Sequence, residues 1–596
     1  MTLKSLSFDI AALHAAYASG TTPSAVLAEA YARIQAAEDP AIFLHLRALD
    51  EAQGEAASLP PFDPKAMPLW GIPFAIKDNI DVAGVPTTAA CPAFAYVAKA
   101  DAFAVAALRK AGAIWLGKTN LDQFATGLVG VRSPYGVPQN AIDPAIVPGG
   151  SSSGSAVAVA RGIVSFALGT DTAGSGRVPA ALNNIVGLKP SLGALSATGV
   201  VPACRTLDTI SIFALTVSDA WTAYRAAAVY DAADAYARPM PTPALGPVPQ
   251  ALRIGVPDAA TREFFGDTAQ AASFAAVMER LKALGHRVTE IDFTPFFEVA
   301  KMLYEGAWVA ERMTVVETLM RENPSALHPV TAKIIGAADK LSAADAFRGI
   351  YRLADLKRAA EPALAAVDLL CVPTIPTFYS LKDLEADPVG PNSRFGTYTN
   401  FVNLMDMCGI AVPVGPRSDG RLGSITLLAK AGRDALTASV AAAIQTGTMG
   451  ATGMALPAAP APSPASMPDE TVLALVGAHM GGLPLNGQIT ERGGRFLEAT
   501  TTAPDYRLSL LPGGPPSRPG LVRVTQGGAS IALELWAMPT ARVGDFLALI
   551  PTPLSLGTVR LSDGRAVTGF LAEAVGVAGA EDISGYGGWR GYLSRG

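Results

Sequence analysis

The sequence predicts an α/β protein with a mixed layer architecture in its first part and a smaller, β-rich α+β domain in its second. Three observations support this fold class. The chain has 596 residues, which is too long for a single hydrophobic core. Strand-like and helix-like patterns alternate up to about residue 450. A stretch rich in Pro and Ala follows, and period-two alternation dominates beyond it.

The first domain is predicted to span residues 1–450. Apolar runs at 70–76 and 164–169 are typical of buried strands, and the patterns at 24–35 and 155–162 are typical of helices. Strands and helices that alternate in this way pack as sheet layers covered by helices. We therefore expect a mixed α/β core in this domain.

The second domain is predicted at residues 470–596. It follows a linker at 451–469, whose Pro, Ala and Ser content indicates a semi-rigid spacer. Alternating apolar residues on either side of Gly527–Gly528 predict one β-hairpin. A second hairpin is expected around Asp563–Gly564. This part of the chain should therefore be a small, β-rich unit.

The composition argues against several classes of function. A net charge of −5 offers no basic surface for nucleic acid, and no apolar run reaches the roughly 18 residues of a membrane span. The four cysteines form no CxxC pair and the five histidines have no metal-ligand spacing, so we expect neither a metal nor another cofactor. The isolated cysteines and an N-terminus unlike a secretory signal favour a cytoplasmic protein.

Two loops rich in Gly and Ser carry the strongest chemical signal. The first, Pro148–Ser155, can be explained as a helix entry in which glycines turn the chain and a serine caps the helix. A phosphate-binding loop is another alternative, but the Gly-Lys-Ser/Thr that it requires does not follow. The second loop, Gly169–Arg177, follows an apolar strand and places Ser175 between two glycines. That arrangement exposes a hydroxyl beside backbone N–H groups that point the same way, as an oxyanion hole requires.

A serine nucleophile needs a base, and no histidine lies near Ser175 in the sequence. Lys77, directly after the apolar run 70–76, is the candidate, because burial disfavours the charged form of a lysine and lowers its pKa. The alternative is a surface lysine, or an ion pair between Lys77 and Asp78. The residues alone leave this choice open.

Lys77 and the two loops together resemble the amidase signature family, and the 24-residue interval from Ser151 to Ser175 matches the spacing of that family. The resemblance implies the amidase signature fold, with a mixed central sheet flanked by helices. It also implies that Ser175 is the nucleophile, that Ser151, preceded by a cis peptide bond, is the bridging serine, and that Lys77 is the base. The oxyanion hole would be formed by the backbone N–H groups of Thr172, Ala173, Gly174 and Ser175.

A further stretch indicates the kind of amide. Tyr304 and Arg312 are separated by about two helical turns, so both side chains can share one helix face. The stretch resembles the allophanate hydrolase branch of the family, which implies that these two residues grip a substrate carboxylate, a task that suits a guanidinium fork. Gly127 would offer its backbone to the substrate. From the residues alone, the alternative is an ordinary helix in which Arg312 pairs with Glu305 or Glu311.

The second domain resembles the tail domain of the same branch at residues 477–486, 498–506 and 587–590, so the likeness spans nearly the whole chain. It implies hydrolysis of allophanate to ammonia and carbon dioxide or bicarbonate in urea degradation, with a tail domain that assists decarboxylation of the N-carboxycarbamate intermediate. His479 is the candidate there, because it is the only histidine of that domain and can exchange a proton near neutral pH. A histidine that only caps or packs in a turn is the alternative.

Three rival interpretations stay open at this point. The chain could be an amidase of the same family acting on another small amide, because one fold serves many amides. It could be a non-catalytic scaffold in which the loops are structural. The tail domain could serve only for dimerisation or docking. The family also suggests a homodimer and a functional link to a separate urea carboxylase.

Overall fold

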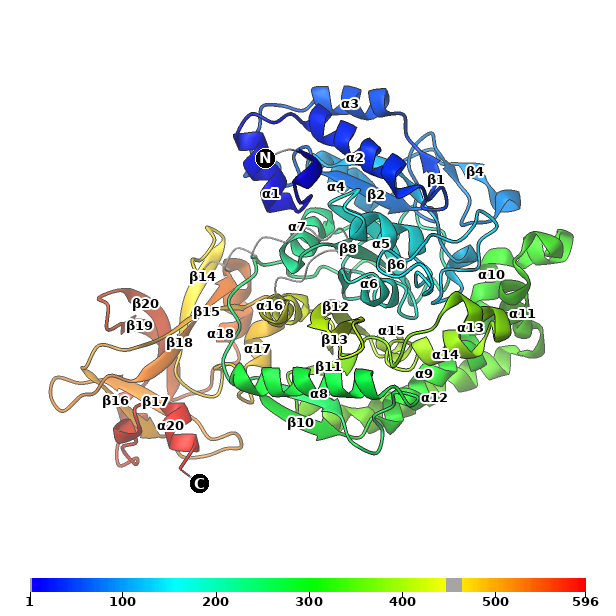
Figure 1. Ribbon diagram of the computed structural model, residues 1–596. Helices are drawn as coiled ribbons and strands as arrows, with labels where there is room; N and C mark the ends of the chain where they lie inside the picture. The colour runs from blue at the N-terminus through cyan, green and yellow to red at the C-terminus, as the bar shows by residue number, and fades with distance from the viewer. Residues whose placement is uncertain (1–2, 446–463, 596) are drawn as a thin grey trace. The chain divides into compact units, whose positions relative to one another are not determined.

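The computed structural model describes residues 3–445 and 464–595, and these group into two compact units (Figure 1). The first unit comprises Met1–Met240, Gly255–Leu281 and Val288–Ala459. The second comprises Pro241–Ile254, Lys282–Arg287 and Pro460–Gly596. Two short segments of the range 1–450 thus group with the tail. The predicted domain bounds stay a prediction, and residues 451–463 of the predicted linker lie outside the described residues.

The first unit is built on a mixed sheet of eleven strands, which together with its flanking helices confirms the predicted fold class. Strand β2 runs parallel to both of its neighbours, β5 and β6, whereas the pairs from β6 to β11 in the sheet order are antiparallel. The strands, in sheet order, are β1 (Phe43–Leu46), β5 (Ile114–Thr119), β2 (Pro73–Lys77), β6 (Phe166–Asp171), β8 (Thr209–Ala214), β7 (Val186–Lys189), β12 (Met407–Pro416), β13 (Leu422–Lys430), β11 (Leu369–Pro373), β9 (Arg253–Pro257) and β10 (Arg287–Ile291). Strands β3 (Pro86–Thr87) and β4 (Tyr96–Val97) form a separate short ladder.

Helices cover both faces of this sheet. Helices α5 and α7 both contact β6 and β8, but α5 packs with α6 whereas α7 packs with α4 and α16. The helices are α1 (Ile10–Ala18), α2 (Pro23–Ala37), α3 (Leu49–Ala57), α4 (Phe103–Lys110), α5 (Ser153–Ala160), α6 (Val178–Leu182), α7 (Val217–Ala227), α8 (Thr268–Ala283), α9 (Thr294–Glu305), α10 (Ala307–Glu322), α11 (Pro329–Gly336), α12 (Ala343–Ala365), α13 (Leu381–Ala386), α14 (Gly390–Phe395), α15 (Phe401–Leu404) and α16 (Asp434–Ile444).

The elements expected from local patterns are present. The apolar runs at 70–76 and 164–169 overlap β2 and β6, and the patterns at 24–35 and 155–162 overlap α2 and α5. All five residues of β2 are buried, as expected for a continuous apolar strand between two parallel neighbours. Helix α2 begins after Thr22, whose side chain accepts a hydrogen bond from the Ala25 N–H, and has proline at its first position.

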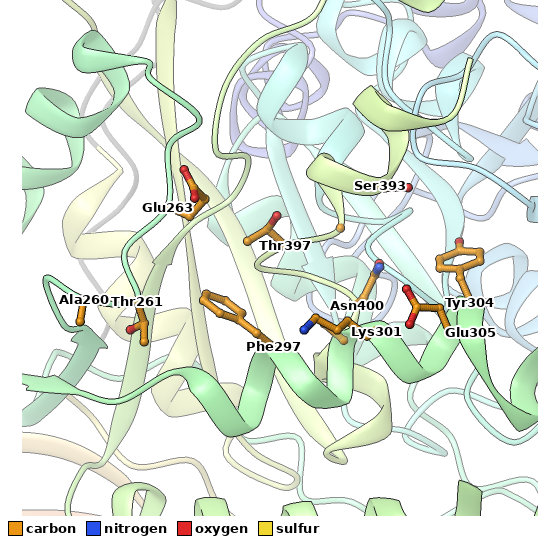
Figure 2. Close-up of a pocket in the computed structure, with 12 residues that line it drawn as sticks. Ala260, Thr261, Glu263, Phe297, Lys301, Tyr304, Glu305, Ser393, Thr397 and Asn400 are labelled. Carbon is orange, nitrogen blue, oxygen red and sulfur yellow. The ribbon is translucent and has the colours of Figure 1, made fainter. Parts of the chain in front are cut away.

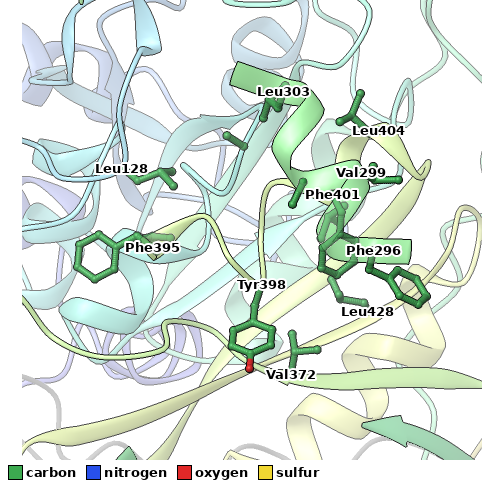
Figure 3. Close-up of a cluster of buried hydrophobic side chains, with 14 of the residues drawn as sticks. Leu128, Phe296, Val299, Leu303, Val372, Phe395, Tyr398, Phe401, Leu404 and Leu428 are labelled. Carbon is green, nitrogen blue, oxygen red and sulfur yellow. The ribbon is translucent and has the colours of Figure 1, made fainter. Parts of the chain in front are cut away.

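A cluster of buried apolar side chains packs helices α9, α14 and α15 against strands β11 and β13 (Figure 3). Phe296 and Phe401 belong to this cluster, with ring centroids 5.3 Å apart. Leu128 of the loop that follows β5 belongs to the same cluster. The core therefore anchors a loop that also contributes Gly127 to the candidate site.

The second unit contains a five-stranded sheet, which confirms the β-rich character predicted for the tail. Its strands, in sheet order, are β15 (Arg495–Thr501), β18 (Ala532–Pro539), β14 (Glu470–Leu475), β20 (Ala566–Ala572) and β19 (Leu554–Arg560). Strands β16 (Tyr506–Leu510) and β17 (Pro519–Arg523) form a separate ladder. The helices are α17 (Gly487–Thr490), α18 (Val543–Leu547), α19 (Ala574–Val577) and α20 (Trp589–Leu593).

Of the two hairpins predicted in the tail, one is present. Strands β19 and β20 pair antiparallel around Asp563–Gly564, so that prediction is confirmed. The hairpin predicted around Gly527–Gly528 is wrong, because β17 pairs with β16 whereas β18 pairs with β14 and β15. Alternation showed that both segments are strands, but it carried no information about their partners.

Candidate active site

Lys77 is the last residue of β2, and its amine is buried between two hydroxyl groups. Its Nζ donates hydrogen bonds to Ser151 Oγ and to Thr170 Oγ1, both at 2.7 Å. The alternative that Lys77 is a surface lysine is wrong, because its side chain is fully buried. The pairing with Asp78 is also wrong, because that carboxylate pairs with Lys118 at 3.1 Å.

Burial brings the pKa of Lys77 close to neutral pH. Removal from water lowers the pKa of Lys77 from its ordinary 10.5 to about 7, against the opposing attraction of Asp122, Asp208 and Asp171. About half of the molecules then carry a neutral amine at pH 7, compared with about three in ten thousand for an unperturbed lysine. The site therefore holds an uncharged proton acceptor in hydrogen-bond contact with a serine.

Ser151 lies in the loop that enters helix α5, and the Gly150–Ser151 peptide bond is cis. The neighbouring Ser152 is the N-cap position of α5, yet no side-chain hydrogen bond caps the helix there. Its Oγ instead donates to the Thr170 carbonyl at 3.3 Å and accepts from the Thr170 N–H at 3.4 Å. The first Gly/Ser loop is thus fastened to the end of β6, where the second loop begins.

Ser175 lies between β6 and α6 and is 2% exposed. Its Oγ donates a long hydrogen bond of 3.4 Å to the Gly127 carbonyl. Among the described hydrogen bonds, none joins Ser175 to Ser151. A direct contact between the two serines would require the Ser175 hydroxyl to leave the Gly127 carbonyl, and catalytic hydrogen bonds are often long or poorly aligned before substrate binds.

The loop that carries Ser175 is held by a buried ion pair. The Asp171 carboxylate accepts two hydrogen bonds from the Arg177 guanidinium, both at 2.9 Å, and one from each of the Gly174 and Gly176 N–H groups at 3.0 Å. The Gly174 N–H is therefore directed at Asp171, and in this conformation it does not serve the predicted oxyanion hole. Within residues 3–445 and 464–595, no protein acceptor takes a hydrogen bond from the N–H groups of Thr172, Ala173 or Ser175.

Arg312 and Tyr304 lie on two different helices. The chain is extended at Gly306, which ends α9 and starts α10, so the expectation of one continuous helix is wrong. The break still brings the side chains together, with the Arg312 guanidinium carbon 5.1 Å from the centre of the Tyr304 ring.

The Arg312 guanidinium is buried without an acidic partner. Its Nη1 donates to Thr126 Oγ1 at 3.2 Å, while its Nε and Nη2 have no partner among the described residues, and neither has the Tyr304 hydroxyl. The alternative pairing with Glu305 or Glu311 is wrong, because no ion pair joins Arg312 to either residue, and Glu311 accepts hydrogen bonds from Thr206. A buried cation and an adjacent hydroxyl are thus left with donors to spare, an arrangement suited to an anionic ligand.

A cavity of about 450 Å³ lies beside Tyr304 (Figure 2). Its lining includes Phe297, Lys301, Tyr304, Glu305, Ser393 and Asn400. The ring of Tyr304 is partly exposed to this cavity, whereas its hydroxyl is buried. Lys77, Ser151 and Ser175 do not line the cavity, and Tyr304 links it to Arg312.

Sequence reasoning missed two residues of this site. Thr170 belongs to the second Gly/Ser loop, but only the structure shows that its hydroxyl receives a hydrogen bond from Lys77. Asp122 lies in the loop between β5 and Gly127, and its backbone N–H donates to the Ser151 carbonyl at 3.0 Å. The position of Thr170 at the end of a strand beside the strand of Lys77 was the available signal for Thr170.

His479 lies in the second unit, packed between two aromatic rings. Its ring stacks on Phe570 at 4.9 Å and meets Phe546 edge-on at 5.2 Å. Its Nε2 is 2.9 Å from Gln488 Oε1. Burial lowers the pKa of His479 below its ordinary value, which favours the neutral ring at neutral pH.

Within residues 3–445 and 464–595, no helix is long and apolar enough to span a membrane. In the same residues, no group of three or more His, Cys, Asp or Glu side chains is placed to hold a metal ion. All four cysteines are buried and unpaired.

Two families match the chain. Residues 25–437 match the family described as amidase, and residues 471–594 match the family described as allophanate hydrolase C-terminal domain. The urea amidolyases of Lachancea kluyveri and Saccharomyces cerevisiae are each 44% identical to this chain, over 88% and 89% of it. The chain spans about 30% of the length of these relatives.

Solved structures are similar to the chain over 99% of its length, and two of them are the following. The allophanate hydrolase of Kluyveromyces lactis is 40% identical, with a TM-score of 0.77, and 99% of it is covered. The urea amidolyase of Kluyveromyces lactis has the same identity and TM-score, but the match covers 37% of it.

Proposed function

The chain belongs to the amidase family, and we propose that it hydrolyses allophanate, with Ser175 as nucleophile, Ser151 as bridging serine and Lys77 as base. Neutral Lys77 accepts the proton of Ser151 while Ser151 takes that of Ser175, and the Ser175 oxygen attacks the urea carbonyl. The N–H groups of Thr172, Ala173 and Ser175 stabilise the oxyanion.

Proton return then completes the reaction. The proton held by Lys77 is handed back through Ser151 to the departing nitrogen, which leaves as ammonia. Water enters, gives up a proton along the same path and attacks the acyl carbonyl. That proton then returns through Ser151 to the Ser175 oxygen, which releases the acyl group as N-carboxycarbamate. Loss of carbon dioxide from that product yields carbamate, which breaks down to a second ammonia and carbon dioxide or bicarbonate.

The unpaired Arg312 guanidinium carries the assignment of the substrate. A buried cation is costly unless it is paired, and a substrate carboxylate can pair with the free Nε and Nη2 while the Tyr304 hydroxyl donates to the same group. Arg312 contacts Thr126 and Ser175 contacts the adjacent Gly127, and allophanate likewise joins a carboxylate to a urea group within one small molecule. Gly127, whose carbonyl faces Ser175, is proposed to accept from a substrate N–H. The likeness to allophanate hydrolase and urea amidolyases supports this substrate.

The tail domain is proposed to assist decarboxylation, with His479 as the proton-transferring residue. The match of residues 471–594 to an allophanate hydrolase C-terminal domain supports this role. The packing of His479 between two phenylalanine rings suits a structural histidine as well, so a dimerisation or docking role of the tail is the alternative outcome of the test.

Location and assembly are proposals of the same kind. Four unpaired, buried cysteines support a reducing, cytoplasmic location. The family likeness supports a homodimer, and the likeness to part of longer urea amidolyases supports a functional link to a urea carboxylase activity. Domain bounds of 1–450 and 470–596 are consistent with the two family matches.

A panel of amides tests the proposed function. Ammonia and carbon dioxide are measured together for allophanate, biuret and an uncharged small amide, with the wild type and Ser175→Ala. We expect allophanate to give the highest kcat/KM and Ser175→Ala to abolish turnover. Faster hydrolysis of the uncharged amide would overturn the substrate, and no ammonia from any amide would favour the scaffold.

His479→Gln tests the tail separately, because glutamine keeps a polar side chain but does not titrate. We expect normal ammonia release from allophanate in the first step and accumulation of N-carboxycarbamate, detected by ¹³C NMR. An unchanged product distribution would assign the tail to dimerisation or docking.

A further inference from the structure

Asp122 is a fully buried carboxylate that the proposed proton relay does not use. It accepts hydrogen bonds from the backbone N–H groups of Gly130 and Arg132, both at 2.9 Å. The Arg132 guanidinium is directed at the carbonyls of Thr126 and Pro388. Among the described residues, no ion pair within 4 Å includes Asp122. The fold therefore holds a buried carboxylate that the Arg132 guanidinium attracts without forming an ion pair with it.

This carboxylate packs directly against the two loops that carry the relay. A Cβ atom added at Gly150 would lie 2.0 Å from Asp122 Oδ2, and one added at Gly127 would lie 2.4 Å from it. The Asp122 N–H donates to the Ser151 carbonyl at 3.0 Å. Asp122 thus touches the residue before the bridging serine and the residue whose carbonyl faces the nucleophile.

We propose that Asp122 is a positioning residue of the relay, which stabilises the ammonium form that Lys77 adopts on taking the proton of Ser151 and which fixes the Gly127 and Gly150 loops around it. The inference rests on the proposed function, because it assigns Asp122 to the same proton transfer. A carboxylate does this without touching the substrate, since charges in a buried site interact more strongly than charges in water.

The other acidic groups near Lys77 are less suited to this task. Asp171 is neutralised by its two-point pair with Arg177. The Asp208 carboxylate accepts hydrogen bonds from the Thr172 hydroxyl and from the N–H groups of Ala203 and Cys204, so it is already engaged by its own loop. Asp78 pairs with Lys118. Asp122 is the carboxylate whose attraction most strongly opposes the loss of the Lys77 proton.

Removing the Asp122 charge should shift the pH profile of the reaction to lower pH. Without Asp122 the ammonium form of Lys77 is less stable, so the pKa of Lys77 falls and the neutral base forms at lower pH. The acid limb of the pH profile of Asp122→Asn should therefore move down by about one pH unit. Because one pKa unit corresponds to a factor of ten in the stability of the ammonium form, the plateau rate should fall by up to about tenfold. A residue that only supports the fold would lower the rate without moving the limb.

Asp122→Asn and Asp122→Ser are compared with the wild type, since serine leaves more room beside Gly127 and Gly150. The matched control is Asp39→Asn, because Asp39 is also a buried carboxylate that accepts two backbone N–H groups, from Ala41 and Gln139. Each variant is assayed for kcat/KM with allophanate between pH 5 and 9. The rate at which phenylmethanesulfonyl fluoride labels Ser175 is measured over the same range.

We expect the acid limb to lie at lower pH in both Asp122 variants, by both assays. In Asp39→Asn it should stay at the wild-type pH. A limb that stays or moves up would overturn the proposal, and so would an equal shift in Asp39→Asn. Failure of both Asp122 variants to fold, seen by circular dichroism, would assign Asp122 to loop stability instead. The proposed substrate fails separately, when wild-type protein is labelled at Ser175 but releases no ammonia from allophanate.

Discussion

Replacing Arg312 by methionine should weaken the use of allophanate without weakening the fold. Methionine is flexible and fills irregular buried space without a charge. The guanidinium that it replaces is 1% exposed, and two of its three nitrogens have no partner among the described residues. A ligand-binding cation of this kind is a cost to the empty protein, so activity and stability should respond in opposite directions.

The size of both effects follows from the contacts of Arg312. Each buried polar group without a partner costs about 1–3 kcal/mol, so removing Nε and Nη2 should regain about 2–6 kcal/mol. The variant loses the hydrogen bond to Thr126, worth about 1 kcal/mol. It also loses the contact with the Tyr304 ring, worth about 0.5–2 kcal/mol. The balance ranges from a free energy of unfolding about 1 kcal/mol lower to one about 4.5 kcal/mol higher, so a net gain is expected.

Binding should respond more strongly. Hydrogen bonds to a charged group contribute about 1.5–3 kcal/mol each. Losing a two-point contact with the substrate carboxylate should therefore cost about 3–4 kcal/mol, because water replaces part of that contact in the variant. That loss lowers kcat/KM for allophanate by about 100- to 1000-fold, mainly through KM.

Steady-state ammonia release and thermal unfolding without substrate measure the two effects in the same preparations. Thr126→Val is the matched control, because it removes the same hydrogen bond and keeps the guanidinium. We expect its kcat/KM to stay within a few-fold of the wild type. The reasoning is refuted if Arg312→Met keeps its KM for allophanate, if an uncharged amide loses as much activity as allophanate, or if the unfolding temperature drops by several degrees.

Three further predictions concern single groups. Protonated Lys77 cannot accept a proton, so kcat/KM should rise with pH through a midpoint near 7, and a flat profile between pH 5 and 9 would contradict this. Thr170→Val removes the acceptor that orients the Lys77 amine, so kcat should fall about tenfold in ammonia-release assays while Thr170→Ser stays near the wild type. Burial and the neighbouring Asp9 raise the pKa of Asp219 to about 7 from 3.8, so the folded protein binds the extra proton and loses stability as pH rises from 4 to 7. At pH 8, Asp219→Asn should therefore have a free energy of unfolding roughly 2–4 kcal/mol above that of the wild type, measured by denaturant titration. At pH 4 the two proteins should differ little.

The sequence by itself determined the features that depend on neighbouring residues. Strands β2 and β6, helices α2 and α5 and the β19–β20 hairpin follow from periodicity and turn residues that lie side by side in the chain. The two Gly/Ser loops could be recognised for the same reason, since each is a short run of neighbouring residues, and Lys77 directly follows an apolar run. Lys77 was expected to be desolvated because of the strand that carries it, and it is fully buried.

The tertiary structure decided which groups meet. Alternation could not show that β17 pairs with β16 while β18 joins another sheet, because many partners suit the same pattern. A helical spacing suggested one face for Tyr304 and Arg312, but the bend at Gly306 and the absence of an acidic partner come from long-range packing. The hydrogen bond from Lys77 to Thr170 and the packing of Asp122 against the relay loops arise in the same way. Local patterns determine where the chain turns and what it buries, whereas the partner of a buried charge depends on residues far away in sequence, and that partner determines its chemistry.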